Sequence, residues 1–221
     1  MKIGILSDLH GNFEATQNVL EIARKKNVKK LFILGDIVGY YFEPEKILQE
    51  LDKWDCHIIK GNHEVMFEKY DINSNLDLPF KYAKQNLSKK QKKFLKDLPK
   101  ELNLRIKTLD FYLCHSTPYH DDKYIYPNSE QKQIEQFFKK NCRIILYGHT
   151  HYQFIHQIDK RILINPGSVG QPRDKKKGAC WAIINTDNLK IDLRRDFYNE
   201  EEFKKKCYEY DPNIKTLKYF I

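Results

Sequence analysis

Apolar residues in the first sixty positions follow two alternating patterns. Continuous apolar runs at residues 3–6, 31–34 and 57–59 are typical of short strands that are buried on both faces. Between them, residues 13–26 and 43–54 carry apolar side chains at helical spacing. This alternation predicts parallel strands joined by crossover helices, as in an α/β fold.

The pattern changes after residue 63. Residues 64–99 contain no glycine, and residues 82–98 are predicted to be helical, with Ser88 as a candidate N-cap and Pro99 as the stop. We interpret residues 64–100 as a helical, cap-like insertion in a single domain that spans residues 1–221. The remainder is rich in short apolar runs and predicts a second sheet with antiparallel pairs. Its strands are expected at residues 104–109, 111–114, 144–147, 154–158, 162–164, 180–184 and 191–193, with helices near 130–140 and 200–209.

Metal-capable side chains recur directly after five of the predicted strands. In α/β sheets, ligands gather just beyond the carboxyl ends of strands, so these side chains are expected in one cleft. Carboxylates, imidazoles and one amide oxygen suit Mn, Fe, Zn, Co or Ni better than calcium. The blocks are Asp8-Leu9-His10-Gly11-Asn12, Gly35-Asp36, Gly61-Asn62-His63-Glu64, His115 and Gly148-His149-Thr150-His151.

The spacing within these blocks refines the interpretation. Asp8 and His10 are two residues apart, so in an extended segment their side chains point the same way. The carboxylate of Asp36 can bridge two ions about 3.5–4 Å apart. Each block alone is common, but five such blocks in order, each at a strand end, together indicate a metal site.

Charge and cysteine content leave the prediction of a metal site unchanged and bear only on partners and location. The net charge is +9, but most of the excess is lysine in solvated stretches, so nucleic acid is an alternative partner that we do not favour. Five cysteines without a C-x-x-C pair predict reduced thiols and a cytoplasmic location. No apolar stretch has the length of a membrane span. The sequence leaves self-association to a homo-oligomer open.

The five blocks resemble, in order, the motifs of the calcineurin-like metallophosphoesterases, over residues 1–196. Residues 35–40, 115–118 and 165–173 are further similar to small prokaryotic phosphodiesterases, a branch that includes diadenosine tetraphosphatase-like proteins. The resemblance implies an α/β fold with two packed mixed β-sheets flanked by helices, a four-layer αββα sandwich.

The resemblance also implies roles for individual residues. Two divalent transition-metal ions are expected, with Mn favoured and Fe, Zn, Ni or Co as alternatives. His63 would face the substrate and protonate the leaving oxygen, while a hydroxide held between the ions attacks phosphorus. Glu64 is expected to support His63. One ion would take Asp8, His10, Asp36 and His151, and the other Asp36, Asn62, His115 and His149.

The substrate side is less determined. Asn12 and Arg173 are expected to bind substrate, and a structural ion pair is an equal alternative for Arg173. Residues 64–99 and 119–127 are expected to border the cleft. In the phosphoprotein phosphatases of the family that this chain resembles, an arginine shortly after the Gly-Asp block binds phosphate. Residues 37–41 contain no arginine, which counts against a phosphoprotein phosphatase.

The leading hypothesis is a phosphodiesterase that acts on a small phosphate ester or a nucleotide-like substrate. The alternatives are a phosphomonoesterase or a dinucleoside polyphosphate hydrolase and, less favoured, a nuclease or a non-enzymatic scaffold.

Overall fold

The structure, a computed structural model, describes residues 1–74 and 77–220. Its first sheet has five strands in the order β10-β9-β1-β2-β3. The strands β1, β2 and β3 are parallel, as the strand–helix alternation predicts, whereas β9 is antiparallel to both of its neighbours. The strands are β1 (Lys2–Leu6), β2 (Val28–Ile33), β3 (Cys56–Ile58), β9 (Ala179–Asn185) and β10 (Ile191–Asp196).

The second sheet also has five strands, in the order β4-β5-β6-β8-β7. Its central strands β5, β6 and β8 are parallel, and the outer strands β4 and β7 pair antiparallel to them. Both sheets are therefore mixed. The strands are β4 (Glu101–Ile106), β5 (Leu109–Cys114), β6 (Ile144–Leu146), β7 (Gln153–Ile158) and β8 (Arg161–Pro166).

The C-terminal strands differ from expectation. The sequence assigns the whole β-rich part to a second sheet, but β9 and β10 return to the first one. The pairing Ile3↔Ile184 places β9 directly beside β1. Nothing in the local pattern of β9 specifies this partner, because a buried strand of continuous apolar residues suits either sheet.

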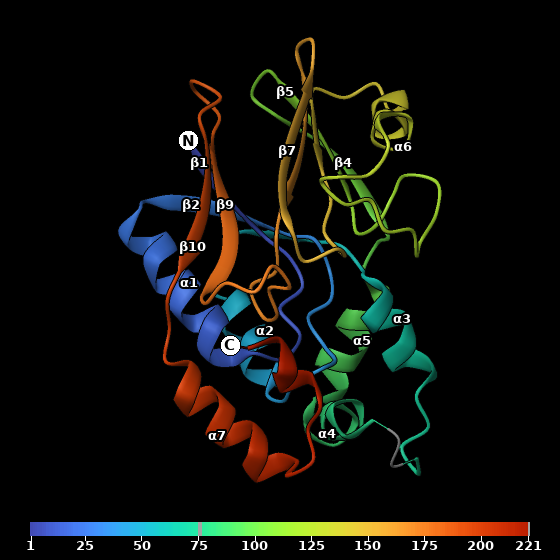
Figure 1. Cartoon of the computed structure of the whole chain (residues 1–221), viewed down its shortest axis with the longest axis vertical. Coiled ribbons are helices and arrows are strands. Elements are labelled where there is room, and N and C mark those ends of the chain that lie inside the picture. The colour runs from blue at the N-terminus through green and yellow to red at the C-terminus, as the bar shows by residue number, and fades with distance from the viewer. Residues whose placement is uncertain (75–76, 221) are drawn as a thin grey trace.

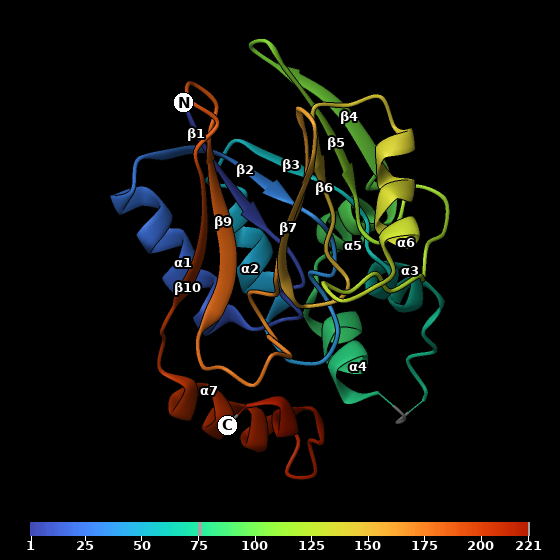
Figure 2. The ribbon, with the colours of Figure 1, turned by 45° about the horizontal axis from the view of Figure 1, so that its top comes forward.

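Helices cover the outer face of each sheet, which gives the expected αββα layers (Figure 2). On the first sheet, Val19 of α1 (Phe13–Lys25) and Ile47 of α2 (Pro44–Leu51) share a buried cluster with Trp181 of β9. On the second, Ile134 of α6 (Gln131–Glu135) packs with Tyr112 of β5, and η1 (Gln136–Lys139) continues α6. A separate apolar cluster fills the space between the sheets.

Three helices occur among the described residues between β3 and β4, and they group at one end of the sheets (Figure 1). They are α3 (Asn62–Lys69), α4 (Leu78–Asn86) and α5 (Lys89–Asp97). Residues 75 and 76, within the expected insertion, lie outside the described residues.

The single helix expected at residues 82–98 is wrong, because the chain leaves the helical conformation at Leu87 and starts again after Ser88. The Ser88 side chain accepts from the Gln91 amide at 3.2 Å, and the Gln91 side chain accepts from the Ser88 amide at 3.0 Å. This reciprocal capping box begins α5. The candidate N-cap was thus correct, and the error was to continue one helix through residues 87 and 88.

The chain ends with α7 (Glu200–Tyr210) and η2 (Thr216–Tyr219). Neither of these nor any other helix within residues 1–74 and 77–220 combines the length and the apolar character needed to cross a bilayer.

Candidate metal centre

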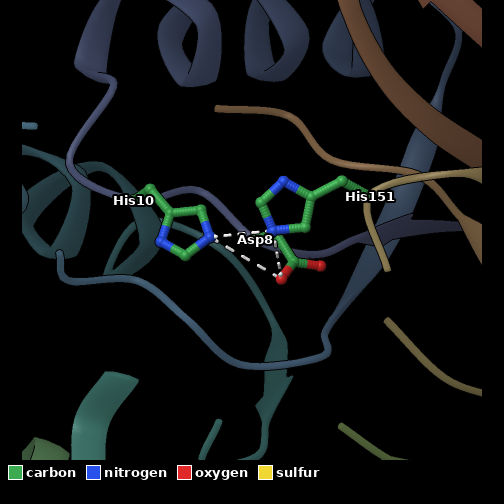
Figure 3. A group of neighbouring side chains, drawn as sticks. All are labelled: Asp8, His10 and His151. Atoms are coloured by element: carbon green, nitrogen blue, oxygen red, sulfur yellow. Dashed lines mark hydrogen bonds and ion pairs between the residues drawn. The ribbon is translucent and has the colours of Figure 1, made fainter. Parts of the chain in front are cut away.

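The residues that follow β1, β2, β3, β5 and β6 meet at one edge of the two sheets. Asp8, His10 and His151 form one group of possible ligands, whose donor atoms lie within 4.8 Å of one another. The Oδ1 atom of Asp8 lies 3.3 Å from Nε2 of His151 and 3.7 Å from Nε2 of His10. Figure 3 shows both imidazoles turned toward the Asp8 carboxylate.

Asp36 lies between this group and a second one. Its Oδ2 atom is 3.1 Å from Nε2 of His115 and 3.9 Å from Nε2 of His10. Asp36, His115 and His149 have donor atoms within 4.8 Å of one another, and the Asn62 Oδ1 atom lies 2.9 Å from His115 Nε2. The structure therefore brings all seven expected ligands into one cluster.

The backbone that carries these ligands is not extended, as the spacing argument for Asp8 and His10 assumed. Left-handed conformations occur at Asp8 (φ 54°), His10 (φ 51°), Asp36 (φ 55°), His149 (φ 67°) and His151 (φ 63°). Such residues cost roughly 1–3 kcal/mol each and concentrate at functional sites. Tight turns after the strands, not alternation along them, direct the ligands into the cluster.

Three of the histidines are oriented by the main chain. In each case the Nδ1 atom lies within hydrogen-bond distance of a carbonyl oxygen, which leaves Nε2 facing the carboxylates. Such second contacts fix the ring and the tautomer of metal-binding histidines. The pairs are His10 with Val38 at 3.2 Å, His115 with Leu34 at 2.6 Å and His151 with Gln171 at 2.5 Å.

Several buried polar atoms in the cluster have no hydrogen-bond partner among the described residues. They are Oδ1 of Asp8, Nδ1 of His63 and Nε2 of His149. Buried polar atoms are almost always hydrogen-bonded, so such exceptions need a reason. Carboxylate and imidazole atoms without such a bond fit the donor set of a divalent transition-metal ion.

The charges of the cluster also suit a cation. Burial opposes ionisation of Asp8, but His151 and His10 hold the pKa of this carboxyl well below its usual range. Burial likewise disfavours a charged His115, yet the Asp36 and Asp8 carboxylates raise the pKa of this imidazole to about 10. Burial lowers the pKa of His149 to about 4, so its ring is neutral at neutral pH. The buried carboxylates of Asp8 and Asp36 thus stabilise a protonated His115. A bound metal ion could supply the same positive charge.

His63 enters the site from the first turn of α3. Its amide donates to Asp36 Oδ1 at 2.8 Å, and its ring centroid lies 4.6 Å from those of Tyr40 and His10. A Cβ atom at Gly39 would lie 2.1 Å from His63 Nδ1, so this position allows only glycine. Sequence reasoning did not single out Tyr40 or Gly39 for this contact, because only the fold places them against the ring.

The expected support of His63 by Glu64 is not what the structure shows. The buried Glu64 carboxylate accepts from the amides of Asp36 at 2.9 Å, Ile37 at 2.7 Å and Gly61 at 2.8 Å. It therefore shapes the loop that carries Asp36. At the start of α3, Glu64 supplies only the glutamate half of a capping box, because Gly61 has no side chain to complete it.

A cavity of about 710 Å³ opens onto the cluster. Val65, Met66 and Asp77 of the predicted insertion line it, as do residues 117, 118, 121, 122 and 124 of the segment after β5. Both segments expected to border the cleft therefore contribute to its walls.

The two expected substrate-binding residues lie in different places. Arg173 lines the cavity and donates to the Tyr40 hydroxyl at 2.9 Å. Within residues 1–74 and 77–220 its guanidinium donates to Tyr40 and Gln171 and forms no ion pair with a carboxylate, which disfavours the structural alternative. Asn12 is fully buried and does not line the cavity. Its side chain accepts from Ala15 at 3.0 Å and donates to Gly170 at 2.9 Å, so we assign it a structural role in place of the expected substrate contact.

The two mixed sheets, with carboxylates and imidazoles gathered at their strand ends, define a metallophosphoesterase. Residues 1–189 match the family described as the calcineurin-like phosphoesterase superfamily domain. The chain belongs to this family.

Individual relatives agree with this assignment. An uncharacterised protein of Methanocaldococcus jannaschii is 30% identical over an alignment that covers 94% of this chain and 90% of that protein. A phosphodiesterase of the same archaeon is 25% identical over 76% of this chain and 83% of its own length. The crystal structure of a metallophosphoesterase from Sphaerobacter thermophilus has the same fold, with a TM-score of 0.85, 24% identity and full coverage of both chains.

Proposed function

We propose that this chain is a dinuclear metal-dependent phosphodiesterase. The observation that carries the proposal is the position of Asp36, whose carboxylate lies within reach of His10 and His63 on one side and of His115 and His149 on the other. One carboxylate between two such groups is the arrangement that holds a pair of ions. The similarity to an archaeal protein named as a phosphodiesterase supports the choice of substrate class.

The donor set fits two divalent transition-metal ions, with Mn favoured and Fe, Zn, Ni or Co as alternatives. When bound, such ions neutralise phosphate charge and activate water. We assign Asp8, His10, Asp36 and His151 to the first ion, and Asp36, Asn62, His115 and His149 to the second.

His63 is the proposed proton donor to the leaving oxygen. Its buried ring lines the cavity directly beside Asp36. Burial lowers the pKa of this imidazole to about 3, so the ring is neutral at neutral pH. An anionic phosphate beside the ring favours its protonated form. Substrate binding is therefore expected to raise the pKa of His63, so that the ring can act as an acid.

The segments that border the cavity determine substrate size. We propose that residues 64–100 act as a cap of a single domain, since Met66 and Asp77 contribute to the cavity wall. The substrate is a small phosphate ester.

The five cysteines are free, in keeping with the proposed cytoplasmic location.

A nucleotide-like substrate is the second candidate, and one observation favours it. Tyr124 lines the cavity, is 41% exposed and has its ring 6.0 Å from that of Tyr126 at an interplanar angle of 15°. An exposed aromatic face beside the phosphate site can stack on a base.

The first prediction concerns metal content. After treatment with a chelator, the chain is expected to bind about two Mn²⁺ ions per molecule by titration calorimetry. Binding to the folded state alone should raise the melting temperature as Mn²⁺ concentration increases. A stoichiometry of one ion, or a melting temperature that does not respond, would contradict the dinuclear site.

The substrate class is tested on the metal-loaded chain. The panel pairs bis(p-nitrophenyl) phosphate with p-nitrophenyl phosphate, which share a leaving group and differ in charge, and adds a dinucleoside tetraphosphate. The proposal expects the highest kcat/KM for the diester. Faster hydrolysis of the monoester or of the tetraphosphate would replace the proposed substrate class by one of the alternatives.

The second prediction concerns Arg173. Its guanidinium lines the cavity and has no carboxylate partner in the described part of the chain, so it is available for a phosphate oxygen. Arg173→Ala is expected to raise KM for the diester roughly 10-fold, and Arg173→Lys to restore only part of it, because lysine cannot form the paired contact. Arg105→Ala, at an exposed arginine of β4, is the control. An unchanged KM in Arg173→Ala would exclude the substrate contact.

A further inference from the structure

The last ten described residues fold back onto the loops of the candidate site. We name residues 211–220, which include η2, the C-terminal strap. Figures 1 and 2 show this segment, in red, returning from α7 to the loops at the end of the first sheet. The strap lies beyond residue 189, where the match to the family ends.

The strap is attached to the loop that follows β2. The Tyr41 hydroxyl donates to the Thr216 carbonyl at 3.3 Å, and the Thr216 hydroxyl donates to the Tyr40 carbonyl at the same distance. Leu217 is buried in one cluster with Tyr41 and Phe42. These contacts fix the strap at the base of the loop whose Tyr40 ring lies against His63.

The strap also contacts Arg173 directly. The guanidinium carbon lies 5.3 Å from the ring centroid of Tyr219 and 5.7 Å from that of Tyr40. Both distances are within the range of cation–π attraction. The Tyr219 ring therefore confines one side of Arg173, and Tyr40 confines another while it accepts a hydrogen bond from it.

A chain of hydrogen bonds connects the same loop to a candidate ligand. Gln171 donates from Nε2 to the Tyr41 hydroxyl at 2.7 Å, and its carbonyl oxygen accepts from Nδ1 of His151 at 2.5 Å. The Gln171 side-chain oxygen also accepts from Arg173 at 3.3 Å. Tyr41, Gln171 and Arg173 thus form one network, with the strap at its outer end.

We propose that the C-terminal strap is a positioning element, in which Tyr219 orients Arg173 toward an anionic phosphate group in the cavity. This inference rests on the proposed function. Tyr219 does not line the cavity, so its effect on the substrate acts through Arg173. The consequence is a selective effect on anion binding, with the metal cluster and the chemical step left intact.

The test compares Tyr219→Ala with Tyr219→Phe, which keeps the aromatic face. Tyr219→Ala is expected to raise KM for bis(p-nitrophenyl) phosphate roughly three- to five-fold, the size of a partly exposed cation–π contact, with kcat unchanged. Tyr219→Phe should behave like the parent. Tyr208→Ala is the control, because this tyrosine of α7 is 51% exposed and lies outside the cavity. Equal KM values for the parent and Tyr219→Ala would overturn the inference.

Two further measurements separate this inference from the proposed function. The dissociation constant of inorganic phosphate, measured calorimetrically on the Mn²⁺-loaded chain, should rise by the same factor in Tyr219→Ala, even if no diester is hydrolysed. The double variant Arg173→Ala/Tyr219→Ala should bind phosphate no more weakly than Arg173→Ala alone. Additive losses, or a parent chain that binds no phosphate, would overturn the positioning role.

Discussion

Replacing His63 by alanine is expected to lower kcat for a phosphodiester by about 10²–10⁴-fold while the metal content stays that of the parent. The ring lines the cavity and belongs to neither proposed ligand set, although its donor atom lies within 4.8 Å of those of His10 and Asp36. Its removal takes away a proton donor and leaves the carboxylates and the remaining imidazoles in place. Metal content by elemental analysis and kcat under saturating Mn²⁺ are the two measurements.

The leaving group separates proton donation from simple charge stabilisation. p-Nitrophenolate leaves readily without a proton, whereas an alkoxide does not. The loss in His63→Ala should therefore be much larger for a dialkyl phosphodiester, which must expel an alkoxide, than for bis(p-nitrophenyl) phosphate. His156→Ala is the matched control, since this half-buried histidine of β7 lies away from the cavity. An equal loss for both leaving groups would contradict the acid role.

The gathering of the ligands could be predicted from the sequence because it depends on a general property of sheets. Asp8, Asp36 and His115 each follow an apolar run that proves to be a strand, and parallel strands end at a common edge. Residue type and position after a strand were sufficient information. No distance within the cluster was needed to see that these residues meet.

The predictions that proved wrong concern features that depend on interactions between distant segments or on single backbone angles. The return of β9 to the first sheet is fixed by its pairing with β1, some 180 residues away in sequence. The break at Leu87 depends on the competition between continuing one helix and capping the next at Ser88. Apolar residues at helical spacing occur both in one long helix and in two consecutive helices, so this pattern cannot distinguish the two.

Residues that support the site were harder to identify than those expected to act in it. Tyr40 contacts His63 only because Gly39 leaves room for the ring. Asn12 follows two candidate ligands in sequence, yet its hydrogen bonds to Ala15 and Gly170 commit it to the fold. The sequence shows which atoms can bind a metal or a phosphate, but it does not show which of them already have a partner.

Of all single substitutions in the cluster, Asp36→Asn is expected to weaken metal binding the most. The change keeps the shape of the side chain and removes the charge that both ligand groups share. If Asp36 bridges two ions, the affinity for both should fall, and activity should decrease by at least about 10³-fold because metal-ion catalysis and charge stabilisation are lost together. Asp8 belongs to the first proposed ligand set alone, so Asp8→Asn should leave about one ion bound.

The comparison of these two variants is the decisive measurement. Calorimetric titration with Mn²⁺ gives the stoichiometry, and circular dichroism shows whether each variant is folded. Asp121→Asn is the matched control, because this exposed carboxylate lines the same cavity but pairs with Lys100 and belongs to neither ligand group. If Asp36→Asn and Asp8→Asn both retained one tightly bound ion, Asp36 would serve a single ion, and the cluster would hold two separate metal sites instead of a shared one.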